Sequence, residues 1–526
     1  MSTFGPENAQ NWDLRKPHAA GPGGAVASQN AIAAEVGAQV LREGGNAVDA
    51  AIATSFAVSV VEPWMSGLGG GGYMLVYLAK DNRVRVVDFG MVAPKTLDPS
   101  DYPLVDGDGA GDLFQWPAVL EDRNVYGYHS MAVPTQVAGI ALAHEQFASK
   151  SWSELIAPAA TLAEGGLPVN WFTTLRISAT AEELRRFETS NAIYLNNGLP
   201  PAGLQGKPPP RRNMGELANT LKRLAEAGPR DFYEGAIADK IVRDANAGGS
   251  RISMQDLTSC AATTHDAMSM TYAGATVYAA PGLTAGPTMF DTLSRIDGKI
   301  AFKDGSPSAE SYAHYAAALK AAYETRLATM GDADDAQYPA CTTHLTTIDG
   351  EGNMVTLTQT LLSAFGSKVV LPETGILMNN GIMWFDTRPG GPNSLGGGKR
   401  PLCNMCPAIV RRTDGFNFAL GASGGRRIMP AVMQNISLMV DGGLSLCDAI
   451  HHPRIDVSGG ETANANIKLS AEAMSAVERV MPVIPVEDAV FPSNFACPNG
   501  VADEPNGDLK FGQSYPMFPM SGAAAA

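Results

Sequence analysis

Thr342 precedes a strand-like run, residues 343–349, and its hydroxyl group is a candidate nucleophile. A threonine hydroxyl is a poor nucleophile unless a base lies beside it. Cutting the chain before the threonine frees the threonine's own amino group, which can then act as that base. The segment therefore predicts a catalytic residue, Thr342, together with a cleavage site between Cys341 and Thr342.

Two other kinds of motif bear on cofactors and metals. The glycine run 69–72 leads into a strand instead of a helix, and no Gly-Lys-Ser/Thr follows it, so tight backbone contact explains it better than phosphate binding. Cys403 and Cys406 have no second Cys-x-x-Cys, and the pair His451-His452 is better explained as structural than as ligating. We therefore expect no cofactor and no metal.

The elements on both sides of the candidate nucleophile predict a layered body. Apolar residues recur at helical spacing from Ser28 to Glu43, and a more uniformly apolar helix over 47–61 is expected to be buried. Further along, strands over 343–348 and 354–360 flank a turn, and a similar hairpin spans 408–420. Helices before and after paired hairpins favour an α/β/β/α arrangement built from both halves of the chain.

Length and charge narrow the classes of function. A chain of 526 residues exceeds the size at which single cores stop growing, so it forms two domains or one large multilayer domain. Its 53 acidic and 38 basic side chains give a net charge of −15, which opposes nucleic-acid binding. The first residues lack a secretory signal, the longest apolar stretch is too short to cross a bilayer, and six scattered cysteines fit a reducing compartment. We expect a cytoplasmic protein without nucleic-acid or membrane partners.

Several blocks, in their order along the chain, resemble the gamma-glutamyltransferase family of N-terminal-nucleophile hydrolases. They are the segment 65–72, Asp88-Phe89 with Ala93-Pro94, and the blocks 342–366, 375–380, 399–402 and 421–425. The resemblance implies an α/β fold, a four-layer αββα sandwich with a largely helical large-subunit portion. It also implies a proenzyme that divides into a large subunit, residues 1–341, and a small subunit, residues 342–526, which together build one body.

The resemblance further implies a role for each catalytic position. Thr342 attacks the carbonyl group of Cys341, and water opens the resulting ester, so that Thr342 becomes the first residue of the small subunit. Its amino group, with an ordinary pKa of about 7.7–8.0, then serves as general base while its hydroxyl forms an acyl-enzyme. Thr360 matches the threonine that hydrogen-bonds the nucleophile. Gly424 and Gly425 match the pair whose backbone N–H groups hold the oxyanion.

The residues that bind the glutamyl group in this family are replaced here. Gly90 stands in place of the arginine that binds the α-carboxylate, and Trp384 in place of the aspartate that accepts from the α-amino group. The other changed substrate-binding positions are Leu362 for an asparagine, Gly381 for an acidic or amide residue, and Cys403 and Asn404 for two serines. Arg426 replaces a serine and is either a new carboxylate anchor or a solvated or structural arginine.

These replacements point away from a γ-glutamyl substrate. Loss of a charged partner at each end of a zwitterion removes hydrogen bonds worth about 1.5–3 kcal/mol apiece. The expected function is an autoprocessed amide hydrolase whose small-molecule substrate carries another acyl group, such as a dicarboxylic monoamide. Family relatives with altered glutamate sites include cephalosporin acylases and an oxamate amidohydrolase. The loop between Phe385 and Lys399 is short, so hydrolysis should exceed acyl transfer, which we expect to be weak.

Two alternatives stay open. One is γ-glutamyl transfer or glutathione hydrolysis with a rearranged pocket. The other is an unprocessed homologue that only binds a ligand or partner, and the intact Thr342, Thr360 and glycine pair argue against it. Association of processed pairs into a larger oligomer is also open.

Overall fold

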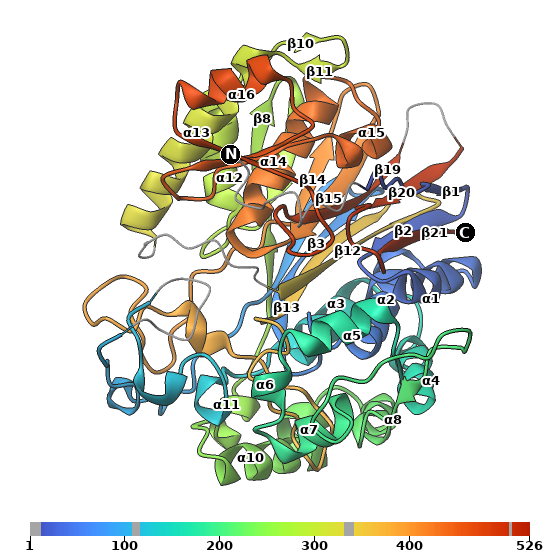
Figure 1. Ribbon diagram of the computed structural model, residues 1–526. Coiled ribbons are helices and arrows are strands. Elements are labelled where there is room, and N and C mark those ends of the chain that lie inside the picture. Colours follow the sequence, from blue (N-terminus) through green and yellow to red (C-terminus); the bar gives the residue numbers. More distant parts are fainter. Residues whose placement is uncertain (1–11, 108–115, 331–340, 504–507) are drawn as a thin grey trace.

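The computed structural model describes residues 12–107, 116–330, 341–503 and 508–526. In these residues two β-sheets lie face to face, and helices cover both outer faces, which gives the layers seen in Figure 1. The αββα sandwich expected from the sequence is therefore confirmed. None of the described helices combines the length and the apolarity needed to cross a membrane.

The first sheet contains the candidate nucleophile. Its described strands, in spatial order and all antiparallel to their neighbours, are β21 (Gly522–Ala525), β2 (Gly24–Ser28), β12 (Cys341–Asp349), β13 (Met354–Leu362), β3 (Gly71–Leu78), β4 (Arg83–Phe89) and β7 (Thr263–Asp266). Leu345 of β12 lies opposite Ser28, and His344 lies opposite Thr358. This sheet combines strands from both sides of position 342, so a cut after Cys341 would leave its ladder of hydrogen bonds in place.

The second sheet packs against the inner face of the first. Its described strands are β1 (Ala19–Gly21), β20 (Lys510–Ser514), β19 (Cys497–Asp503), β15 (Asn417–Ser423), β14 (Ala408–Arg411), β9 (Ala275–Ala279) and β8 (Met268–Tyr272). Hydrogen bonds tie the two sheets together. The Thr356 hydroxyl donates to the Leu420 carbonyl at 3.1 Å, and Asn499 Nδ2 donates to the His344 carbonyl at 2.7 Å.

Helix α2 (Ala47–Val61) supports the nucleophile strand from the outside. Asn46 caps it by accepting from the backbone N–H groups of Val48 and Asp49, both at 2.9 Å, and the Asp49 carboxylate accepts in return from Asn46. Every residue of α2 is buried, which confirms the prediction from its uniformly apolar sequence. The neighbouring α1 (Ala31–Arg42) begins three residues later than predicted, because Asn30 is its cap and Ser28 still belongs to β2.

The other helices complete the two outer layers (Figure 1). On the side of α2 they are α3 (Gln136–Phe147), α4 (Trp152–Gly165), α5 (Trp171–Ser178), α6 (Ala181–Leu184), α7 (Glu188–Tyr194), α8 (Leu217–Ala227), α9 (Asp231–Glu234), α10 (Ala236–Ala247) and α11 (Met254–Thr258). Against the second sheet lie α14 (Ile428–Val440) and α15 (Leu446–His451), with α12 (Gly286–Ile296), α13 (Ala309–Thr329) and α16 (Ala471–Glu478) farther out. The long helical stretch before position 258 agrees with the helical large-subunit portion predicted from the sequence.

Candidate active site

Side chains of β12 alternate between the two layers that flank it, as strand geometry requires. His344 turns toward the second sheet, where its ring fills the space beside Gly421. Thr343 turns the other way and donates from its hydroxyl to Glu62 Oε2, at the end of α2, at 2.8 Å. The register of β12 against β13 shifts between Cys341 and Thr343, and such bulges re-aim a side chain at the end of a ladder. Thr342 is the residue at this shift.

The structure brings Thr342 and Thr360 together, as the sequence predicts. The Thr342 hydroxyl donates to Thr360 Oγ1 at 3.4 Å, and Thr342 is only 5% exposed. Thr360 Oγ1 also accepts from the backbone N–H of Leu362 at 2.8 Å, which fixes the position of its oxygen. A hydroxyl held in this way can orient the attacking oxygen of Thr342. The catalytic roles of both threonines stay predictions.

Gly424 and Gly425 follow β15 and begin a short helix, η6 (Gly425–Arg427), that leads into α14. Both have positive φ, 134° and 63°, and a Cβ on Gly424 would lie 2.9 Å from the Ala496 Cα, so glycine is required there. Within the described residues neither backbone N–H donates a hydrogen bond. Donors without partners at a helix N-terminus suit a developing negative charge.

A hydrogen bond between the two sheets indicates that this glycine pair lies near the start of β12, where Thr342 is. Ser423, which precedes Gly424, accepts from the side chain of Gln29. Gln29 follows Ser28, and Ser28 pairs with Leu345, three residues along from Thr342. The end of β15 and the start of β12 therefore meet at one edge of the sandwich.

Two buried titratable groups behind Thr342 were not singled out from the sequence. Burial lowers the pKa of His344 to about 3, and both ring nitrogens are hydrogen-bonded, to Thr358 at 2.9 Å and Thr356 at 3.2 Å. A ring with so low a pKa takes up a proton poorly, and both of its nitrogens are already bonded, so His344 is unsuited to act as the base. Burial raises the pKa of Glu62 to about 8, so this carboxyl group is largely protonated near neutral pH. An acidic residue at the end of a uniformly apolar helix was the signal that could have revealed Glu62.

Three of the predicted substrate-binding residues meet in one apolar cluster. Leu362, Trp384 and Cys403 are buried together with Tyr73 and Met91. Leu362 has φ 86°, a left-handed conformation that favours glycine or asparagine over leucine. The cluster adjoins the candidate catalytic pair, because the N–H of Leu362 is bonded to Thr360.

Gly381 begins the short helix η5 (Gly381–Trp384) and presses against this cluster from outside. Its N–H donates to Asn379 Oδ1 at 2.8 Å, and a Cβ there would lie 2.7 Å from the Ala132 Cβ and 2.9 Å from Met91 Sδ. The structure thus leaves no space for the acidic or amide side chain of the family at this position.

Gly90 lies beside the guanidinium of Arg400. A Cβ on Gly90 would come within 2.5 Å of Arg400 Nη2 and of the Tyr73 hydroxyl oxygen. Arg400 forms a two-point ion pair with Asp88 and donates to the Tyr73 hydroxyl at 3.1 Å, while burial and the neighbouring Cys403 thiol raise the pKa of Tyr73. Gly90 also borders a cavity of about 190 Å³ that Asp88 and Arg400 line. It is therefore connected to the apolar cluster through Arg400 and Tyr73.

Asn404 and Arg426 are the remaining predicted substrate-binding residues. Asn404 is half-buried, and its Oδ1 accepts from Arg326 Nη2 at 3.4 Å. Arg426 lies in η6 directly after the glycine pair, and its carbonyl accepts from the Tyr323 hydroxyl. This contact does not distinguish an anchoring role for Arg426 from a structural one. The side chain of Cys341 lies outside the described part of the structure.

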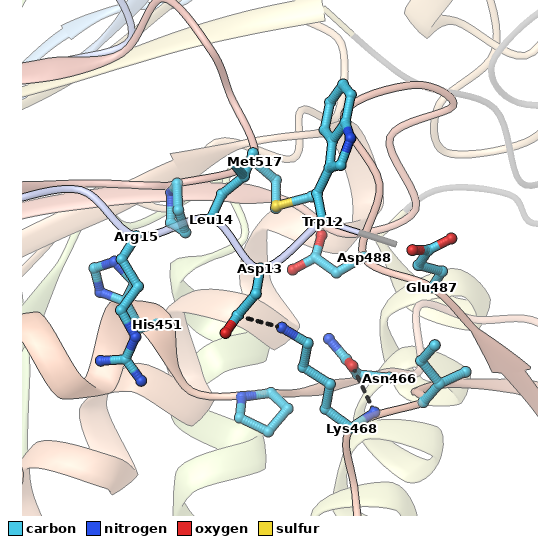
Figure 2. A pocket seen from close by; sticks show the side chains of 13 residues that line it. Trp12, Asp13, Leu14, Arg15, His451, Asn466, Lys468, Glu487, Asp488 and Met517 are labelled. Carbon is cyan, nitrogen blue, oxygen red and sulfur yellow. Dashed lines mark hydrogen bonds and ion pairs between the residues drawn. The ribbon is translucent and has the colours of Figure 1, made fainter. Parts of the chain in front are cut away.

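A larger cavity, about 630 Å³, lies elsewhere (Figure 2). It lies between the segment 12–15 and residues near the C-terminus, and Asp13 and Lys468 are ion-paired across it at 2.9 Å. No residue of the predicted catalytic or substrate-binding set lines it. Among the described side chains, no group of three or more His, Cys, Asp or Glu is placed to hold a metal ion.

Known proteins resemble this chain over most of its length. The gamma-glutamyltranspeptidase family model matches residues 33–341 and 335–472. The glutathione hydrolase proenzyme of Pseudomonas sp. (strain A14) is 30% identical over 480 residues, covering 82% of this chain and 81% of that protein. The acylase ACY 1 proenzyme of Pseudomonas sp. (strain SE83) is 30% identical over 485 residues, covering 86% and 85%. The crystal structure of a cephalosporin acylase from Bacillus halodurans has the same fold, with a TM-score of 0.85 at 23% identity over 99% of both chains.

Proposed function

Because this chain belongs to the gamma-glutamyltranspeptidase family, we propose that it is a threonine amide hydrolase that activates itself by cutting the bond between Cys341 and Thr342. The observation that carries the proposal is the hydrogen bond between the Thr342 and Thr360 hydroxyls, at the edge where the N–H groups of Gly424 and Gly425 donate to none of the described residues. Both relatives described above are named as proenzymes, which supports processing of this chain.

The position of the Thr342 hydroxyl supports self-cleavage by the following steps. Its oxygen attacks the carbonyl carbon of Cys341, the C–N bond to Thr342 breaks, and the hydroxyl proton ends on the departing nitrogen. Water then opens the ester, which leaves a carboxylate on Cys341 and a free hydroxyl and amine on Thr342. The new amine supplies the base that His344, with its low pKa and both ring nitrogens bonded, cannot supply.

Substrate cleavage repeats the same chemistry between molecules. The amine accepts the hydroxyl proton as Thr342 Oγ1 attacks the amide carbonyl, and the N–H groups of Gly424 and Gly425 stabilise the oxyanion. The proton passes to the leaving amine, and an acyl group remains on Thr342. Water releases this acyl group as a carboxylic acid and restores the hydroxyl. The short loop after Phe385 favours water over a bound acceptor amine, so we propose that hydrolysis exceeds transfer.

We further propose that the acyl group is not γ-glutamyl. A γ-glutamyl group carries both an ammonium and a carboxylate on its α-carbon, and Trp384 and Gly90 offer no charged partner for either. Leu362, Trp384 and Cys403 are instead buried members of one apolar cluster. The competing function, glutathione hydrolysis, is favoured by the 30% identity to proteins named glutathione hydrolase.

Two experiments test the proposal. The purified chain should separate on a denaturing gel into residues 1–341 and 342–526, and the smaller fragment should begin Thr342-Thr343-His344. Thr342→Ala should remain one chain, while the exposed control Thr161→Ala on α4 should be cut like the wild type. An uncut wild-type chain would exclude self-cleavage. In a panel of acyl anilides, efficient turnover of the γ-glutamyl compound would establish the competing function.

A further inference from the structure

The turn that follows α2 contacts the start of β12. Glu62 ends α2 and is fully buried. Its Oε2 accepts from the Thr343 hydroxyl at 2.8 Å, and Thr343 directly follows the candidate nucleophile Thr342. The ladder between β12 and β13 is irregular here, because its register shifts between Cys341 and Thr343. The bond to Glu62 is therefore an additional constraint on the residue next to the nucleophile.

The same turn contacts the end of β13. The backbone N–H of Met65 donates to the Glu62 carbonyl at 3.1 Å, and the Met65 carbonyl accepts from the Leu361 N–H at 3.1 Å. Leu361 directly follows Thr360. The turn thus bonds to the residue after each of the two candidate catalytic threonines, whose hydroxyl oxygens are 3.4 Å apart. A change in this turn would change the alignment of the two hydroxyls.

An acid at the end of α2 is unfavourable for the fold itself. Glu62 Oε1 is buried and has no hydrogen-bond partner among the described residues. Burial raises the pKa of Glu62 to about 8, although the Thr343 hydroxyl and the Arg176 guanidinium of α5 act in the opposite direction. A buried polar atom without a partner destabilises a protein, and such exceptions concentrate at functional sites. Stability therefore does not explain why a largely apolar helix ends in a carboxyl group.

A protonated carboxyl group suits a position beside the nucleophile. An ionised carboxylate near the Thr342 amine would stabilise the ammonium form, which cannot accept a proton. Burial keeps Glu62 largely protonated near neutral pH, and the charged group of the described residues that acts on it is Arg176. His344, the next residue of β12, turns toward the second sheet. Glu62 can therefore hold Thr343 without placing a negative charge next to the base.

We propose that Glu62 is a positioning residue that, through Thr343, aligns the Thr342 hydroxyl with Thr360 for self-cleavage and for turnover of the amide substrate. The inference rests on the proposed function and adds to it a residue that touches neither the substrate nor the reacting atoms. No bond to Glu62 forms or breaks in the reaction, because its effect is exerted by the hydrogen bond to Thr343 alone.

Three substitutions separate positioning from packing. Thr343→Val removes the hydroxyl donor and keeps the branched shape of the side chain. Glu62→Leu removes the acceptor and keeps an apolar side chain in the space, whereas Glu62→Gln keeps both the shape and an oxygen that accepts from Thr343. Thr161→Val on α4 and Glu145→Leu on α3 are the matched controls, because both side chains are exposed.

Self-cleavage is measured first, because it needs no added substrate. Each full-length chain is synthesised in vitro, and the loss of the uncut chain is followed over time on denaturing gels. Thr343→Val and Glu62→Leu should each slow this loss about tenfold or more, since small displacements of reacting groups have effects of this size. Glu62→Gln and both controls should stay within about threefold of the wild type, because the geometry at Thr342 is kept.

Turnover by the processed enzyme is measured with glutaryl or γ-glutamyl 4-nitroanilide, whichever the wild type hydrolyses faster. Thr343→Val and Glu62→Leu should each lower kcat about tenfold and leave KM within about twofold, since neither side chain binds the substrate. In a double-mutant cycle, the combined variant should lose no more kcat than Thr343→Val alone, because Glu62 acts only through that hydroxyl. Additive losses would overturn the inference.

The outcomes separate the two proposals. If the wild type is cut, and Thr343→Val and Glu62→Leu are cut and turn over at the wild-type rate, Glu62 has no positioning role and the proposed function stands. A Glu62→Gln variant as slow as Glu62→Leu would also overturn the role, because the acceptor for Thr343 would then not be what matters. If Glu62→Leu fails to fold, Thr343→Val and Glu62→Gln decide. An uncut wild-type chain that hydrolyses no anilide would overturn the proposed function itself.

Discussion

Gly90→Ala adds the smallest side chain at a position where the family has an arginine, and the surrounding atoms leave no room for it. The new Cβ would lie 2.5 Å from both Arg400 Nη2 and the Tyr73 hydroxyl oxygen. Overpacking of this kind costs about 1–3 kcal/mol, and displacing Arg400 from Asp88 loses charge-assisted hydrogen bonds worth about 1.5–3 kcal/mol. Both contacting atoms are the far ends of side chains; the Arg400 side chain is 38% exposed and can move toward water, whereas the Tyr73 ring is buried and cannot, so we expect the variant to be destabilised by about 1–3 kcal/mol.

The loss should appear as a lower melting temperature and a lower urea midpoint. Gly203→Ala is the matched control, because a Cβ there has no neighbour closer than 3.7 Å. In an Arg400→Ala background the cost of Gly90→Ala should shrink, because one of the two contacting atoms is gone, and a double-mutant cycle measures that coupling.

The same contacts apply to the Cβ of an arginine. We therefore expect Gly90→Arg to be at least as destabilised as Gly90→Ala and to gain no useful activity on a γ-glutamyl anilide. A Gly90→Arg variant as stable as the wild type, with γ-glutamyl turnover raised about tenfold or more, would refute the claim that Arg400 occupies this space.

Three further predictions concern the catalytic end of the sandwich. Thr360→Val removes the oxygen that accepts from Thr342 and from the Leu362 N–H, so kcat of the processed enzyme should fall about 10–100-fold with little change in KM; an unchanged kcat would remove Thr360 from the mechanism. Gly424→Ala forces a side chain to φ 134° and against Ala496, so kcat should fall about 10²–10³-fold, and full activity would show that this N–H does not hold the oxyanion. Burial raises the pKa of Glu62 to about 8, so between pH 4.5 and 8 the folded chain keeps a proton that the unfolded chain releases. As the pH rises through this range, the contribution of Glu62 to the free energy of unfolding should fall by about 1.4 kcal/mol per pH unit. Glu62→Gln should flatten that part of a melting-temperature profile, and a profile with the wild-type slope would contradict the assignment.

Helices and hairpins that depend on neighbouring residues could be predicted from the sequence. The helix 47–61 is apolar on all sides and is fully buried, and the turns at 349–353 and 413–415 join the paired strands as predicted. Other features depend on residues far apart in sequence. Gly90 and Arg400 are separated by 310 positions, and no residue close to Gly90 in the sequence indicates that the Arg400 guanidinium lies beside it. Arg326 lies in an ordinary helical pattern, and only the fold shows that it is buried and donates to the Cys403 carbonyl and to Asn404.

Leu362 suggests how a new substrate could arise without loss of the chemistry. Its contact with the candidate catalytic residues is made by its backbone N–H, which donates to Thr360 whatever side chain the position carries. Its side chain faces the apolar cluster with Trp384 and Cys403. The positive φ at 362 is costly for leucine, whereas asparagine, the residue that the family resemblance implies at this position, adopts it easily. Substitutions among these side chains can therefore change the acyl group that binds, while the sheets and the glycine pair continue to position the atoms that react.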